Sequence, residues 1–126
     1  MRQETHKIMS AFLKGESASA QRTNTDGNTV WLHGNKIAHR QQDTYDHGLV
    51  QFTLAGWPTV TTRERINGML DVFGYSDFGV IQKNLNQYLV YKGKKVRSVD
   101  DKEVISLAEL DHLRDEMKNS RNTLSV

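Results

Sequence analysis

The segment from residue 23 to residue 70 constrains the fold more than any other part of the chain. A polar turn at residues 24–28 opens it, and Gly34-Asn35 joins two runs of strand-forming residues, 29–33 and 36–40. Asp-Gly and Gly-Asn supply the positive φ angles that tight turns need. Residues 49–55 alternate apolar and polar, which is typical of a half-buried strand. The segment therefore predicts an antiparallel meander.

A two-residue turn at Gly34-Asn35 also predicts the register of the first hairpin. Leu32 would face Ile37, and Val30 would face His39. Trp31 would lie opposite Ala38 on the other face of the sheet.

A helix follows the meander at residues 61–73. Gly56-Trp57-Pro58 ends the last strand because proline has no N–H for a ladder. Thr61 and Glu64 have the spacing of a capping box, and Gly74 is the expected stop. Apolar residues at helical spacing form one stripe, which we expect to be buried: Ile66, Met69, Leu70 and Phe73. Gly68, on the expected outer face, indicates close approach or simple tolerance, and we favour tolerance.

The flanking segments complete an α+β fold. Residues 6–14 fit either a helix that stops at Gly15 or a hairpin between strands 7–13 and 17–23, and we favour the hairpin because a meander follows. Strands are expected at 78–83, 87–92 and 95–99, and a last helix is capped by Ser106 with Glu109. The predicted fold is an antiparallel β-meander of about five strands with a packed helix, a second small hairpin and a C-terminal helix. Residues 1–118 form a single domain and 119–126 a flexible tail.

Composition excludes several classes of protein. The chain has 126 residues, which fits one domain, and it has no cysteine. Disulfides, thiolate nucleophiles and thiolate metal sites are therefore excluded. No apolar run has the length of a membrane span, and the first residues lack the pattern of a signal peptide. We expect a cytoplasmic protein.

The net charge is only +2, but the charges are unevenly distributed. Residues 78–99 contain no acid and five cations, whereas residues 100–116 contain seven acids and only two bases, Lys102 and Arg114. This asymmetry can mark a basic binding face. The simpler interpretation, which we favour slightly, is that the acidic C-terminal helix packs beside the basic hairpin and neutralises it.

The start of the 61–73 helix is the first candidate site. A helix N-terminus attracts anions, Thr61 and Thr62 add hydroxyl groups, and Arg63 and Arg65 can bind phosphate. Trp57 could stack on a base. The alternative explanation is that Thr61 and Glu64 satisfy the cap by themselves and Trp57 packs over the sheet. The arginines would then solvate the helix or pair with Glu64 and Asp71.

The basic hairpin is the second candidate. Five cations are interleaved with two tyrosines that could provide stacking surfaces: Lys83, Tyr88, Tyr91, Lys92, Lys94, Lys95 and Arg97. The alternative is a solvated edge whose lysines prevent aggregation.

A third group contains histidines and carboxylates. His33, His39, Asp43, Asp46 and His47 could ligate a metal or supply a base, but their spacing matches no metal motif. The sequence also contains no nucleophile elbow and no glycine-rich phosphate loop. We therefore expect no metal, no cofactor and no catalytic residue.

Four blocks of sequence resemble a family of short uncharacterised proteins from tailed bacteriophages: Asn24-Thr25-Asp26-Gly27, residues 32–38, residues 54–57 and residues 59–67. The resemblance covers roughly residues 7–97. It implies a phage setting in the host cytoplasm and transfers no catalytic residue.

The function that we expect is a non-enzymatic accessory binding protein. It would contact nucleic acid, or a host protein that handles nucleic acid, through the basic face, in a host-takeover role and without membrane contact. The alternatives are an inhibitor that sequesters a host protein by protein–protein contact only, a structural virion-associated protein and, more remotely, a metal-dependent hydrolase.

Overall fold

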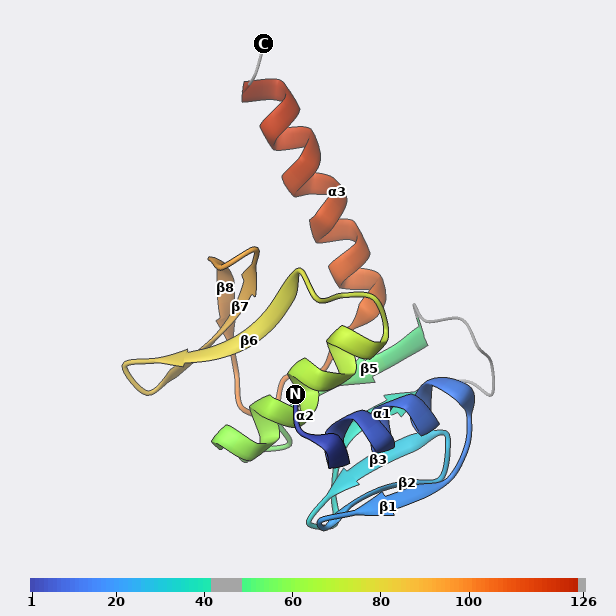
Figure 1. The fold of residues 1–126 in the computed structure, drawn as a ribbon. Helices are drawn as coiled ribbons and strands as arrows, with labels where there is room; N and C mark the ends of the chain where they lie inside the picture. The colour runs from blue at the N-terminus through green and yellow to red at the C-terminus, as the bar shows by residue number, and fades with distance from the viewer. Residues whose placement is uncertain (42–48, 125–126) are drawn as a thin grey trace.

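The computed structural model describes residues 1–41 and 49–124, with side chains up to residue 119. Figure 1 shows a folded body from which the last helix projects. The helices of this part of the chain are α1 (Gln3–Lys14), α2 (Val60–Val72) and α3 (Leu107–Leu124). The strands are β1 (Ala18–Ala20), β2 (Thr23–Thr25), β3 (Thr29–Leu32), β4 (Asn35–Arg40), β5 (Val50–Phe52), β6 (Phe78–Lys83), β7 (Asn86–Tyr91), β8 (Lys94–Val99) and β9 (Ile105–Ser106).

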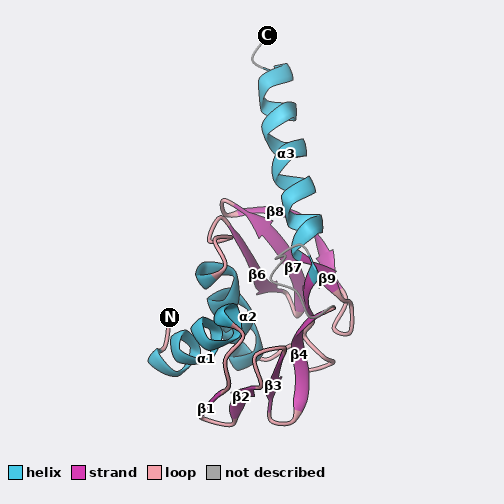
Figure 2. Cartoon of the chain, turned by 90° about the vertical axis from the view of Figure 1, so that its right-hand side faces the viewer, coloured by secondary structure: helices cyan, strands magenta, loops and turns pink. Residues whose placement is uncertain are grey.

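The strands form two antiparallel sheets. The larger sheet has the order β1-β2-β3-β4-β5-β9, and the smaller one has the order β6-β7-β8. Helices α1 and α2 lie together on one face of the larger sheet (Figure 2). The predicted α+β class is confirmed, including the meander, the packed helix, the second hairpin and the C-terminal helix.

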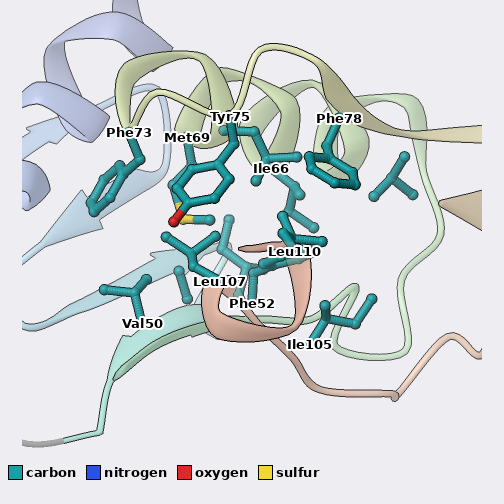
Figure 3. Close-up of a cluster of buried hydrophobic side chains, with 14 of the residues drawn as sticks. Val50, Phe52, Ile66, Met69, Phe73, Tyr75, Phe78, Ile105, Leu107 and Leu110 are labelled. Atoms are coloured by element: carbon teal, nitrogen blue, oxygen red, sulfur yellow. The ribbon is translucent and has the colours of Figure 1, made fainter. Parts of the chain in front are cut away.

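The core joins the two sheets to the base of α3. Phe52 of β5 pairs with Ile105 of β9, and α3 begins directly after that pair. Leu107 and Leu110 in its first turn are fully buried. They lie between α2 and β5 (Figure 3), so the root of the projecting helix is part of the core.

The favoured hairpin at residues 6–14 is wrong, and the helix is correct. Ile8, Met9 and Phe12 are all fully buried on one side of α1. Gly15 ends the helix at φ 74°, and its N–H reaches the last turn. The amphipathic period of 3.6 residues therefore outweighs the nearby meander.

The predicted register of the first hairpin is also wrong. The turn is at His33-Gly34, with φ of 51° and 81°, one residue earlier than expected. A bulge between Val30 and Trp31 then places Val30 opposite Ala38 and Trp31 opposite Lys36. Because side chains alternate along a strand, one extra residue changes every later pairing.

Helix α2 begins slightly earlier than predicted. Thr59, not Thr61, is its N-cap, and the Thr59 hydroxyl accepts from the Thr62 amide at 3.1 Å. The predicted apolar stripe is buried as expected. Gly68 is buried rather than on the outer face, because it lies against α1. The preference for simple tolerance at Gly68 is therefore wrong.

The C-terminal half matches its predicted elements closely. Strands β6, β7 and β8 begin within one residue of the expected positions. Ser106 caps α3 by accepting from the Glu109 amide at 3.2 Å. The helix itself extends to Leu124, beyond the predicted end of the domain at residue 118.

Candidate functional site

A hollow lies beside the N-terminus of α2. Its volume is about 450 Å³. The buried side chains of Leu32, Ile37 and Leu54 form its apolar floor. The more polar part of its lining comes from two places, the β3–β4 turn and the start of α2: His33, Asn35, Trp57, Thr59, Thr61 and Thr62. We call this hollow the Trp57 groove.

The chain turns sharply just before the groove. Ala55 and Gly56 both have positive φ, 56° and 81°, and the Trp57 amide donates to the Leu54 carbonyl at 2.9 Å. This turn leaves Trp57 57% exposed. The structure therefore brings predicted residues Trp57, Thr61 and Thr62 together around one hollow.

Arg63, in the first turn of α2, does not line the groove. Its Nη1 donates to the Pro58 carbonyl at 2.9 Å, to Gln82 Oε1 at 3.2 Å and to Gln87 Oε1 at 3.0 Å. All three acceptors are neutral, so these bonds fix the guanidinium without cancelling its charge. The alternative in which the arginines pair with Glu64 and Asp71 is therefore found for Arg65, which pairs with Glu64, and not for Arg63 among the described residues.

Arg65 does not belong to any solvent-facing site. Its side chain is 2% exposed and lies between α1, α2 and β2. Nε donates to Thr23 Oγ1 at 2.9 Å, and Nη1 contacts Thr5 Oγ1 and the Glu64 carboxylate. The prediction that Arg65 contacts a ligand is therefore corrected: this arginine holds the fold together.

Three lysines gather at the β7–β8 turn. Lys92, Lys94 and Lys95 are all exposed, and none of them forms an ion pair with another residue of the described part. We call these three residues the lysine tip. The Lys92 ammonium lies 5.4 Å from the Tyr91 ring centre, and that of Lys95 lies 4.2 Å from the Tyr88 ring centre.

The two tyrosines are not open stacking surfaces. Tyr91 is only 7% exposed, and Tyr88 is half-buried beneath Lys95. Lys83 is exposed but lies at the opposite end of the small sheet, because it pairs with Asn86 while Lys94 pairs with Tyr91. Five residues of β7 separate those pairs, roughly 16 Å at about 3.3 Å per residue.

Arg97 forms ion pairs with the acidic C-terminal segment. It contacts Glu109 at 2.7 Å and Glu103 at 2.6 Å. Desolvation lowers the pKa of Arg97, but its hydrogen bonds to Glu109 and Glu103 outweigh that effect and the pKa is raised. Neutralisation by the C-terminal segment therefore holds for Arg97 and does not extend to the lysine tip.

His33 and His39 do not converge on one site. His33 lines the Trp57 groove, whereas His39 Nδ1 lies 2.7 Å from Thr29 Oγ1. Burial, and then the nearby charge of Lys36, lowers the pKa of His39. Asp43, Asp46 and His47 lie outside the described residues. Within residues 1–41 and 49–124, no three His, Asp or Glu side chains are placed to share a metal ion.

Sequence reasoning did not identify Asn35 and Thr59, which line the groove, or Lys102, which lies next to it. Asn35 lines the groove because the turn begins one residue earlier than expected. Lys102 lies against the Trp57 turn: a Cβ built on Gly56 would be 3.3 Å from Lys102 Cε. No local pattern links residue 102 to residue 56, so only the fold reveals this contact.

Comparison with known proteins identifies a family. The model of the Kyanoviridae Gp96 protein family matches residues 1–107. No curated protein matches the chain, and no solved structure does. Within the described ranges, no helix has both the length and the apolar character that crossing a bilayer requires.

Proposed function

The chain belongs to the Kyanoviridae Gp96 protein family, and we propose that this bacteriophage protein is a non-enzymatic accessory protein that binds nucleic acid in the host cytoplasm. The partner could also be a host protein that handles nucleic acid. Binding in either case would use exposed cations rather than a reaction centre.

The observation that carries the proposal is the lysine tip. Lys92, Lys94 and Lys95 stand around one turn, exposed and without ion pairs to other described residues. Two of them lie over tyrosine rings, which orders the side chains and leaves their charge in place. Three ammonium groups on a short turn suit the phosphates of a nucleic acid backbone, since each contact releases a counterion.

Fluorescence anisotropy with labelled single-stranded and duplex oligonucleotides tests the proposal. We expect binding at low salt that weakens steeply as salt rises. The triple variant Lys92→Glu, Lys94→Glu, Lys95→Glu should bind at least about 10-fold more weakly. Its salt slope should fall by roughly 2 on a single strand, at about 0.7 per lost phosphate contact.

A matched control separates the tip from net charge. Arg2→Glu, Lys14→Glu, Lys118→Glu changes the charge equally at three exposed and scattered positions. This control should retain most of the affinity. Equal losses in the two triple variants, or no binding by the wild type at low salt, would overturn the proposal.

Contact with a host protein alone is the second candidate, and a separate observation favours it. Met1, Val60 and Ile81 are 60%, 67% and 38% exposed, and all three line a hollow of about 440 Å³ between α2 and β6. Exposed apolar groups around a hollow are common in protein-binding surfaces. A pull-down from host lysate distinguishes the two candidates. Direct protein contact is supported if a host protein stays bound after nuclease treatment and in high salt, and if the double variant Val60→Asp, Ile81→Asp no longer captures it.

A further inference from the structure

Trp57 is placed in a way that packing does not explain. Tryptophan offers more apolar surface than most side chains, and leaving it in water sacrifices the free energy of its burial. Trp57 is nevertheless 57% exposed, and it is not among the residues packed against the core. The ring instead borders the groove whose floor is Leu32, Ile37 and Leu54.

The groove combines the features of a site for a flat, partly polar ring. The floor is buried and apolar, the wall is aromatic, and hydrogen-bonding groups come from His33, Asn35 and Thr61. None of the described residues that line it is acidic. The Glu64 carboxylate, one turn away on α2, is engaged by Arg65 and Thr5.

Two cations contact the residues that precede and follow Trp57 in the chain. On one side, Arg63 is bonded to the carbonyl of Pro58, the next residue, and its other acceptors are neutral. On the other side, the Lys102 side chain lies over Gly56, the preceding residue. The backbone carbonyl of Asp101 accepts from the Gly56 amide at 2.8 Å and fixes residue 102 there. Two cations are therefore held against the residues on either side of Trp57 in the chain, next to the groove although neither lines it.

We propose that the Trp57 groove takes one unpaired base of a single-stranded nucleic acid. The base stacks on Trp57 above the apolar floor, and the flanking phosphates lie toward Arg63 and Lys102. A duplex is not the ligand, because its bases are stacked and paired, whereas bases in single strands can be splayed out onto aromatic side chains. This inference rests on the proposed function: it names the ligand and adds a second contact to the lysine tip.

The test compares Trp57→Ala with Trp57→Phe and Leu85→Ala on a 12-nucleotide single strand. Stacking on one aromatic ring contributes enough that Trp57→Ala should bind roughly 5- to 100-fold more weakly, while the phenyl ring restores part of the affinity. Leu85 is 87% exposed in the β6–β7 turn, so Leu85→Ala removes apolar surface elsewhere and should change nothing. In a Trp31→Phe background, the fluorescence of Trp57 should be quenched as the oligonucleotide binds.

An abasic oligonucleotide makes the test specific to the base. Wild type should bind it more weakly than the normal strand, whereas Trp57→Ala should bind the two equally. A second variant tests the site even if Trp57→Ala fails to fold. Lys102 is exposed, so Lys102→Glu should weaken binding and leave the circular dichroism spectrum unchanged.

The outcomes separate this inference from the proposed function. If Trp57→Ala binds as the wild type does and only the lysine-tip variant fails, the groove inference is wrong and the proposed function stands. Equal loss on duplex and single strand upon Trp57→Ala would also overturn the groove inference. If the wild type binds no oligonucleotide at low salt, both fail together.

Discussion

At the scale of single residues, the buried guanidinium of Arg65 links α1, α2 and β2 through hydrogen bonds. Thr5 is fully buried, and its hydroxyl donates to Glu64 Oε1 and accepts from Arg65 Nη1, both at 2.5 Å. Thr5→Val keeps the shape and removes both bonds, which leaves polar groups in the core less well satisfied. We expect a loss of about 1–3 kcal/mol in the free energy of unfolding, measured in urea.

The conservative variant provides the control for this prediction. Thr5→Ser retains the hydroxyl and should recover most of the stability. A Thr5→Val protein with wild-type stability would show that the bonds contribute nothing net. No sequence pattern predicts this network, because Thr5, Thr23 and Arg65 come into contact only when α1 and α2 pack on β2. Arginine is also rarely fully buried, so a buried position for Arg65 is not expected.

His39 makes stability depend on pH. Burial, and then Lys36, lowers its pKa in the folded protein below the ordinary value of 6.5. Above pH 6.5 the imidazole is neutral in both states and contributes no difference. As pH falls below 6.5, the unfolded chain takes the proton first, so stability declines until the folded pKa is reached.

A variant isolates this effect from other titrations. We compare the melting temperatures of the wild type and His39→Gln, since glutamine does not titrate. The difference, wild type minus variant, should decrease as the pH is lowered from 7.5 to 5. The measurement is a series of thermal melts in matched buffers. A difference that stays constant over this range would contradict the role given to His39.

At the scale of elements, Gly68 sets how closely α1 and α2 pack. A Cβ at this position would lie 2.3 Å from Thr5 Cγ2 and 3.2 Å from Met1 Sδ. Gly68→Ala should therefore destabilise the protein by about 1–3 kcal/mol through overpacking, although alanine is the better helix former by about 1 kcal/mol. Chemical denaturation measures the change.

Two comparisons sharpen this prediction. Gly79→Ala meets its nearest neighbours, Asn67 and Val90, at an ordinary 3.6 Å, so it should be close to neutral. Thr5→Ser removes the methyl group that clashes, and the cost of Gly68→Ala should shrink in that background. If the cost is unchanged by Thr5→Ser, the helix contact is not its cause.

The elements also show what local sequence can predict. The buried stripe of α2, the Ser106 cap and the three strands of the small sheet follow from spacing and turn chemistry over a few residues. The bulge near Trp31 and the one-residue shift of the His33-Gly34 turn do not, since a slip of one residue is decided by packing across the whole sheet. For the candidate site, Trp57, Thr61 and Thr62 were predictable, whereas Lys102 was not.

At the scale of the molecule, the N-terminal part of α3 packs into the core and the C-terminal part projects away from it. The family match ends at residue 107, where the helix begins. Yet Leu107 and Leu110 are fully buried, and Arg114 pairs with Asp77 at 2.7 Å while its guanidinium lies 5.0 Å from the Tyr75 ring centre. Met117, in the third turn, also packs against the core. We therefore expect the fold to require α3 up to about residue 117 and not the part beyond it.

Two truncations test this division. A chain ending at residue 106 loses both buried leucines, each worth about 2–5 kcal/mol when truncated to alanine. That loss is comparable with the whole stability of an ordinary domain, about 5–15 kcal/mol, so this chain should not unfold cooperatively. A chain ending at residue 118 keeps the leucines and the Arg114–Asp77 pair, and its thermal melt should stay cooperative within a few degrees of the full chain. A cooperative melt at the wild-type temperature for the 106-residue chain would show that α3 lies outside the core altogether.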